Sequence, residues 1–158
     1  MGCFRASLER WQVCVSAKRL IVADAIYDRF VELYKKGVAE LRAGDPLSPE
    51  TTLAPLSSQK AADDLRNQVE EARKLGATVE VIGAPVPEQG AFFQPLLVTG
   101  LENNAARHWE FFGPVTQLYR AEDENDAIRI ANDSPYGRGG SVFTRDTGRG
   151  VAVARRIY

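Results

Sequence analysis

Cys14 has the clearest chemical potential, since it lies just before a short apolar segment, 18–22. That segment predicts a buried strand, and a side chain at the edge of a strand can project into a site. A thiolate there attacks electrophilic carbon if its pKa falls from about 8.5 or a nearby base removes the proton. The competing interpretation is inert packing, because free cysteine is often buried. The only histidine, His108, is more typical of a surface or structural residue, and Cys3 is interpreted as incidental.

A second candidate site combines Glu110 with Phe111 and Phe112, just before a turn and an alternating segment, 115–120. A carboxylate can accept two hydrogen bonds from a ribose diol while an aromatic ring packs on a nicotinamide or adenine face. The alternative is a solvated glutamate beside two core phenylalanines. The residues alone leave both interpretations open.

Two other kinds of site are disfavoured. The glycine-rich run 137–140 lacks the spacing of a phosphate-binding loop and leads into an apolar segment, so it predicts an ordinary loop. The two cysteines and single histidine do not have the spacing of metal ligands, and we expect no metal.

Strand and helix patterns alternate along the chain. We expect strands at 18–22, 78–82, 94–98, 115–120 and 141–144. We expect helices from an Asp24 cap to a stop at 44–46, from Ser57 or Ser58 to Leu75, over 124–132 with an Asp123 cap, and over roughly 147–158. This alternation predicts an α/β fold with an open, mostly parallel sheet and helices on both faces. The chain shows no repeats and no linker between domains.

The composition is that of a globular domain, with 158 residues, 44% hydrophobic and 26% charged. It excludes disordered, collagenous and coiled-coil classes. A net charge of -1 without a basic block argues against nucleic acid as a partner. No apolar run approaches the roughly 20 residues that span a bilayer. We therefore expect a cytoplasmic protein with no membrane partner.

Three segments together resemble the aldehyde dehydrogenase superfamily. They are QVCVSAKRLIV from Gln12, EFFGPV from Glu110 and ANDSPYGRGGSVFTRD from Ala131, in the family order. The resemblance covers 12–158 and is closest to the succinate-semialdehyde dehydrogenase branch. It implies a truncated aldehyde dehydrogenase catalytic domain, preceded by an atypical lead-in at 1–11.

The resemblance also implies roles for individual residues. Cys14 matches the nucleophile that attacks the aldehyde to form a thiohemiacetal, after which a hydride passes to NAD or NADP and the thioester is hydrolysed to the acid. Glu110 matches the residue that binds the nicotinamide ribose hydroxyls, and Phe112 matches the aromatic beside the nicotinamide. The positions that match residues shaping the site are Gln12, Gly113, Pro114, Asn132, Pro135, Tyr136 and Gly137.

The chain departs from the family pattern in two ways. Glu9 and Trp11 replace the Asn-x-Gly that precedes the glutamine, and Trp109 replaces the first acidic residue of the Glu-Glu-x-Phe-Gly-Pro motif. The general-base glutamate, the oxyanion-hole asparagine and the dinucleotide-binding domain of the family have no counterpart in the 158 residues. We therefore expect a fragment that lacks most of the cofactor site and is inactive alone.

Three functional hypotheses follow. The first is a part of an NAD(P)-dependent aldehyde dehydrogenase that takes a small-molecule aldehyde, with succinate semialdehyde as a candidate. The second is a non-catalytic binding or assembly module that retains the fold. The third is a small cysteine hydrolase. Apolar faces left exposed would favour a homo-oligomer or another association through those faces.

Overall fold

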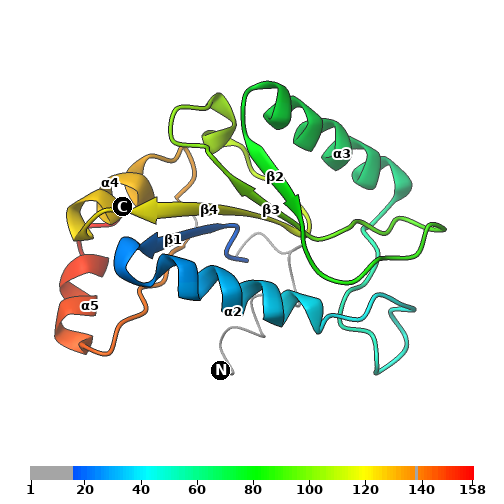
Figure 1. The fold of residues 1–158 in the computed structure, drawn as a ribbon, viewed down its shortest axis with the longest axis horizontal. Coiled ribbons are helices and arrows are strands. Elements are labelled where there is room, and N and C mark those ends of the chain that lie inside the picture. Colours follow the sequence, from blue (N-terminus) through cyan, green and yellow to red (C-terminus); the bar gives the residue numbers. More distant parts are fainter. Residues whose placement is uncertain (1–15, 138) are drawn as a thin grey trace.

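The computed structural model describes residues 16–137 and 139–158, and its centre is a four-stranded sheet (Figure 1). The strands are β1 (Arg19–Ala23), β2 (Thr78–Val81), β3 (Leu96–Thr99) and β4 (Val115–Ala121), in the order β1-β4-β3-β2. β4 pairs in parallel with both β1 and β3, whereas β2 is antiparallel to β3 at one edge. The predicted open, mostly parallel sheet is confirmed.

Helices cover both faces of this sheet, as predicted (Figure 1). The helical elements are η1 (Asp24–Ile26), α2 (Tyr27–Ala39), α3 (Gln59–Lys74), η2 (Ala105–His108), α4 (Glu124–Asn132) and α5 (Thr147–Ala154). α2 packs on one face, and α3 with part of α4 packs on the other. The parallel pair β1 and β4 thus has the covering on both sides that buried parallel strands require.

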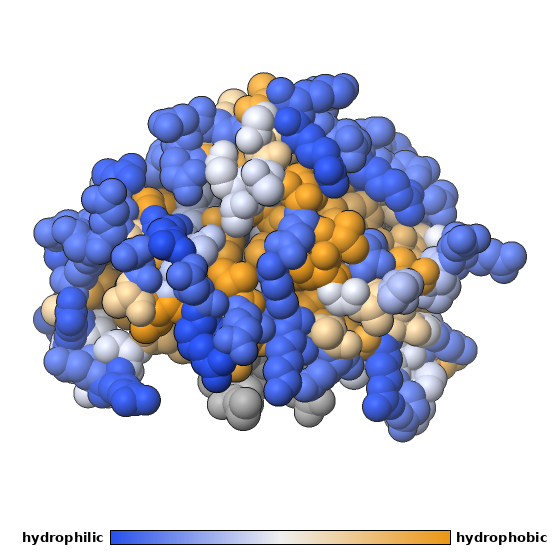
Figure 2. All heavy atoms as spheres, in the orientation of Figure 1, coloured by the Kyte–Doolittle hydropathy of each residue, from blue (hydrophilic) through white to orange (hydrophobic). Residues whose placement is uncertain are grey.

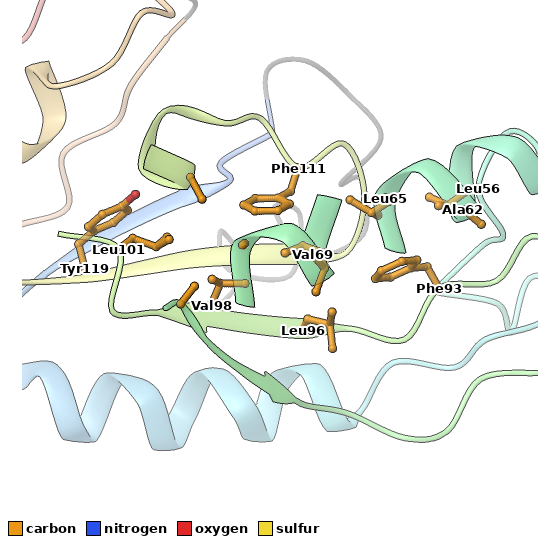
Figure 3. Close-up of a cluster of buried hydrophobic side chains, with 14 of the residues drawn as sticks. Leu56, Ala62, Leu65, Val69, Phe93, Leu96, Val98, Leu101, Phe111 and Tyr119 are labelled. Atoms are coloured by element: carbon orange, nitrogen blue, oxygen red, sulfur yellow. The ribbon is translucent and has the colours of Figure 1, made fainter. Parts of the chain in front are cut away.

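The alternation of side chains along β3 and β4 divides the core into two clusters. Leu97 and Leu118 point toward α2, where they pack with Tyr34 and Val38. Their neighbours in the strands point to the opposite face, toward α3, as successive strand residues must. Figure 3 shows this second cluster, which contains Val98, Tyr119, Val69, Leu65 and Phe111.

Helix α3 begins and ends where local chemistry predicts. Ser58 caps it, because the Ser58 side chain accepts a hydrogen bond from the amide of Ala61 at 3.1 Å. Gly76 follows its last turn with a φ of 97°, a conformation that costs glycine little. Of the two serines considered from sequence, Ser58 is therefore the cap.

The predicted start of the first helix is wrong in one respect. Asp24 makes no side-chain cap bond; its carboxylate instead accepts a hydrogen bond from Arg120 in β4 at 2.9 Å. The chain first forms the short η1, and α2 begins at Tyr27. α2 also ends at Ala39, before the glycine and proline predicted to stop it at 44–46.

Two predictions near the C-terminus also need correction. Residues 141–144 were expected to form a strand, but they form neither a strand nor a helix in the described structure. A strand needs a hydrogen-bonding neighbour, and Phe143 here is 77% exposed. α5 ends at Ala154 rather than continuing through Ile157 and Tyr158.

The surface in Figure 2 is mostly hydrophilic, with apolar areas between the charged side chains. Larger exposed apolar side chains include Ile26, Leu33, Val81, Phe112, Phe143 and Tyr158. Across 16–137 and 139–158, none of the helices has both the length and the apolar character needed to cross a membrane.

Candidate functional site

The segment from Trp109 to Phe112 approaches the sheet with alternating side chains. Phe111 is fully buried beside α3, and its ring meets the Trp109 ring edge-on at 6.4 Å between centroids. Gln117, buried in β4, donates a hydrogen bond to the Trp109 carbonyl at 2.7 Å. These contacts anchor the segment and leave Glu110 and Phe112 on its outer side.

Gly113 and Pro114 lead the chain directly into β4, and their predicted role in shaping the site stays a prediction. A Cβ atom on Gly113 would lie 2.5 Å from Cδ2 of Leu65, so the backbone approaches α3 too closely for a side chain. The Pro114 carbonyl accepts a hydrogen bond from Leu96 in β3 at 2.8 Å. The turn is therefore fixed between α3 and the sheet.

Lys18 lies against the outer side of this segment. Its side chain is only 7% exposed, and its Nζ is 3.3 Å from Oε1 of Glu110, whose side chain is 29% exposed. The same Nζ lies 4.9 Å from the centre of the Phe112 ring, a cation–π contact. Glu110 and Phe112, predicted from sequence, are thus held together by one ammonium group.

The second predicted segment, 132–137, follows α4. Asn132 is the last residue of that helix; its side chain donates to the Arg156 carbonyl at 2.9 Å and accepts from the Tyr158 amide at 3.1 Å. Pro135 and Gly137 are exposed. The described contacts of Asn132 therefore lie toward the end of the chain and not toward Glu110.

Asp133 links the 132–137 segment to η2, the helical turn that precedes Trp109. Its carboxylate accepts a hydrogen bond from Nε of Arg107, and Nε2 of His108 lies at the same distance, 2.8 Å, from its other oxygen. The bond with His108, followed by that with Arg107, holds the pKa of Asp133 below its usual value. His108 has the structural role predicted for it, and it places η2 beside the end of α4.

Sequence reasoning missed three polar residues of this region: Lys18, Arg19 and Gln117. Arg19 donates to the carbonyls of Ile130, Ala131 and Asp133 at the end of α4. The available signals were weak: two cations directly before an apolar strand, and one glutamine on the inward side of an alternating one. Their partners are distant in sequence, which no local pattern encodes.

The Glu110 carboxylate and the Phe112 ring have the chemistry that the nicotinamide end of a dinucleotide requires. A carboxylate has about four acceptor positions, so an ion pair with Lys18 leaves capacity for two ribose hydroxyls. Phe112 is 47% exposed beside it and offers a ring face or edge to a planar group. A shallow hollow of about 300 Å³ lies elsewhere, beside Trp109 and three α3 residues, and includes neither Glu110 nor Phe112.

Cys14 and Gln12 lie outside the described residues, as does the lead-in at 1–11. Their predicted roles stay predictions. The described chain resumes at Ser16, so the residues next along the chain from Cys14 are those that lead into Lys18 and β1.

Sequence comparison finds many similar proteins. Succinate-semialdehyde dehydrogenase [NADP(+)] of Deinococcus radiodurans is 47% identical over 148 residues, which are 92% of this chain and 31% of the relative. Benzaldehyde dehydrogenase of Bacillus subtilis is 37% identical over 92% of this chain and 30% of its own length. The chain thus spans about a third of the length of the curated relatives it matches.

Solved structures give the same picture. The succinic semialdehyde dehydrogenase of Streptococcus pyogenes, in complex with NADP+, superposes with a TM-score of 0.91 at 41% identity, over 98% of this chain and 34% of that one. Betaine aldehyde dehydrogenase of Staphylococcus aureus, in complex with NAD+, gives 0.88 at 28% identity over 98% of this chain and 33% of that one. The family profile described as "Aldehyde dehydrogenase family" matches residues 3–158, and the chain therefore belongs to the aldehyde dehydrogenase family.

Proposed function

We propose that this chain supplies the nucleophile and the nicotinamide-end contacts of an NAD(P)-dependent aldehyde dehydrogenase, with succinate semialdehyde as the aldehyde. The observation that carries the proposal is the arrangement of Glu110 and Phe112 around Lys18, close in sequence to Cys14. A carboxylate and an aromatic ring thereby lie together beside the residue that precedes β1, which supports a shared role in binding one ligand.

Cys14 is the proposed nucleophile. Its sulfur forms a bond to the aldehyde carbon, the carbonyl π bond breaks toward oxygen, and the oxygen takes up a proton to give a thiohemiacetal. NAD or NADP, held by Glu110 and Phe112, would accept the hydride from the thiohemiacetal carbon. The hydroxyl proton leaves to solvent as the carbonyl re-forms, which gives a thioester on Cys14, and water then displaces the sulfur to give the carboxylic acid and the thiol.

Glu110 and Phe112 have binding roles in this proposal. The two carboxylate oxygens of Glu110 accept hydrogen bonds from the ribose hydroxyls nearest the nicotinamide. The ring of Phe112 packs beside the nicotinamide and keeps water from that side. Gly113 and Pro114 contribute indirectly, because they fix the backbone that carries both side chains.

The choice of succinate semialdehyde and NADP rests on the relatives. Relatives from Deinococcus radiodurans and Mycobacterium avium are named succinate-semialdehyde dehydrogenases [NADP(+)] and are 47% and 39% identical to this chain. The benzaldehyde and betaine aldehyde dehydrogenases are less similar, at 37% and 28%. The proposal therefore takes the four-carbon acid aldehyde over an aromatic one.

Aldehyde protection of the thiol tests the proposal, since thiohemiacetal formation needs no cofactor. Iodoacetamide labelling of Cys14, followed by peptide mass spectrometry, should be slowed several-fold by millimolar succinate semialdehyde and less by benzaldehyde. Cys3 in the same chain is the internal control. Equal labelling of Cys14 with and without the aldehyde would contradict the nucleophile assignment.

A further inference from the structure

The ammonium group of Lys18 is nearly enclosed by protein. Its side chain is 7% exposed, whereas its partner Glu110 is 29% exposed and Phe112 is 47% exposed. Removing a charge from water is costly unless an opposite charge and further contacts compensate. Here the carboxylate at 3.3 Å and the ring at 4.9 Å both face the cation.

The backbone of Lys18 is equally fixed. Its carbonyl accepts a hydrogen bond from the amide of Gln117 at 2.8 Å, which extends the parallel pairing of β1 and β4 by one residue. Gln117 also donates through its side chain to the Trp109 carbonyl. The strand that carries Lys18 and the segment that carries Glu110 are thus held by one buried glutamine.

The backbone of Glu110 has a further support, because Gln68 of α3 donates to its carbonyl at 3.2 Å. Within residues 16–137 and 139–158, its carboxylate forms an ion pair with Lys18. The ion pair with Lys18 thus constrains the carboxylate, whereas the bond from Gln68 constrains the backbone that carries it. The ring of Phe112 also contacts the Lys18 ammonium, and about half of its surface is exposed to solvent.

We propose that Lys18 is a positioning residue, which holds the Glu110 carboxylate and the Phe112 ring in the orientation that receives the nicotinamide ribose. The inference rests on the proposed function for the identity of that ligand. Lys18 itself does not contact the reacting atoms. A buried cation with two partly exposed partners fixes them at their inner ends and leaves their outer surfaces to a ligand.

The first test is made on the chain without ligand. Lys18→Met removes the charge and keeps an unbranched apolar side chain, whereas Lys18→Arg keeps the charge. Carbon-13 relaxation of the Glu110 γ-methylene should show a clear loss of order in Lys18→Met and little change in Lys18→Arg. Lys35→Met, which breaks the more exposed Lys35–Glu80 pair, is the matched control and should leave Glu110 unchanged.

The second test uses NADP and NAD as probes, titrated to millimolar concentration and followed by chemical shifts of Glu110 and Phe112. Lys18→Met should raise the dissociation constant about tenfold, and Lys18→Arg should raise it by no more than about threefold. In a Glu110→Gln background the same Lys18→Met change should have no more than about a threefold effect, because Lys18 acts mainly through Glu110.

The outcomes separate the two proposals. Unchanged order of Glu110 in Lys18→Met overturns the positioning role, whatever the chain binds. A tenfold loss that persists in the Glu110→Gln background overturns it as well, because Lys18 would then act elsewhere. Failure of both dinucleotides to bind the unaltered chain contradicts the cofactor role of Glu110 and Phe112, and the relaxation measurement still decides whether Lys18 orients them.

Discussion

Arg19 joins the first strand to the end of a distant helix, since its Nη2 donates to the carbonyl of Ile130 at 2.7 Å. The same guanidinium donates to Ala131 and Asp133 and lies 5.2 Å from the centre of the Tyr119 ring. The last carbonyls of a helix have no partners within it and carry the negative end of its dipole. Arg19 donates to several of them at once, so it holds β1 against the end of α4 and the start of the 132–137 segment.

Replacing Arg19 by methionine should destabilise the chain by about 2 kcal/mol, because charge-assisted hydrogen bonds to partly buried carbonyls are lost together. Chemical denaturation measures the change. Arg29→Met is the control: Arg29 pairs with Glu32 on the exposed side of α2, with side chains 66% and 68% exposed, and its loss should cost less than about 0.5 kcal/mol. Equal effects of the two changes would contradict the role assigned to Arg19.

Gly113→Ala should destabilise the fold by about 1–3 kcal/mol, because the new methyl group would lie 2.5 Å from Leu65 in a packed core. Gly137→Ala provides the comparison, since no atom lies within 4 Å of a Cβ at that position. It should change stability by less than about 0.5 kcal/mol, and any change should be stabilising. Thermal unfolding of the two variants side by side measures the difference, and a Gly113→Ala protein as stable as the parent would refute the close packing.

Tyr34 makes the stability depend on alkaline pH. Burial raises its pKa to about 12, although a 2.5 Å hydrogen bond with Thr116 opposes the shift. The unfolded chain loses this proton near pH 10, so the stability from Tyr34 is present below pH 10 and is lost as pH rises toward 12. Between pH 9 and 11 the parent should lose about 1 kcal/mol more than Tyr34→Phe, which lacks the group. Parallel pH profiles of the two proteins would contradict this.

Ser58→Ala should cost about 1 kcal/mol, because it removes the oxygen that accepts the Ala61 amide at the start of α3. Ser57→Ala is a close control, since the neighbouring serine is outside the cap position. Urea denaturation of both variants should show a lower midpoint for Ser58→Ala alone. A loss in Ser57→Ala of the same size would mean that the cap is assigned to the wrong serine.

The sequence predicts the parts of this fold that depend on neighbours along the chain. α3 follows from a cap, an apolar stripe and a terminal glycine, all within 58–76. The predicted Asp24 cap is wrong because the Asp24 carboxylate instead accepts a hydrogen bond from Arg120, almost a hundred residues away. The strand expected at 141–144 is wrong because its apolar pattern cannot tell whether a pairing strand lies beside it.

The candidate site likewise contains residues that the sequence singled out and residues that it could not. Phe111 is buried and Phe112 is 47% exposed, so the two phenylalanines are not both core residues, and the binding roles of Glu110 and Phe112 stay predictions. Lys18 could not be found, because a lysine before a strand is ordinarily solvated, and its burial depends on Glu110, which is far along the chain. Gln117 could not be found for the same reason. Its backbone amide donates to Lys18 and its side chain donates to Trp109, and both contacts form only after folding.

The proposed nucleophile, Cys14, offers the most direct test of the account. The measurement is the rate of iodoacetamide alkylation of Cys14 and of Cys3 in the folded chain near neutral pH, resolved by peptide mass spectrometry, with the urea-unfolded chain as reference. A thiol prepared for attack on an aldehyde should react at least about tenfold faster than Cys3 when folded and at the same rate when unfolded. Equal rates in the folded chain, or protection of Cys14 from the reagent, would contradict the assignment of an aldehyde dehydrogenase nucleophile to this residue.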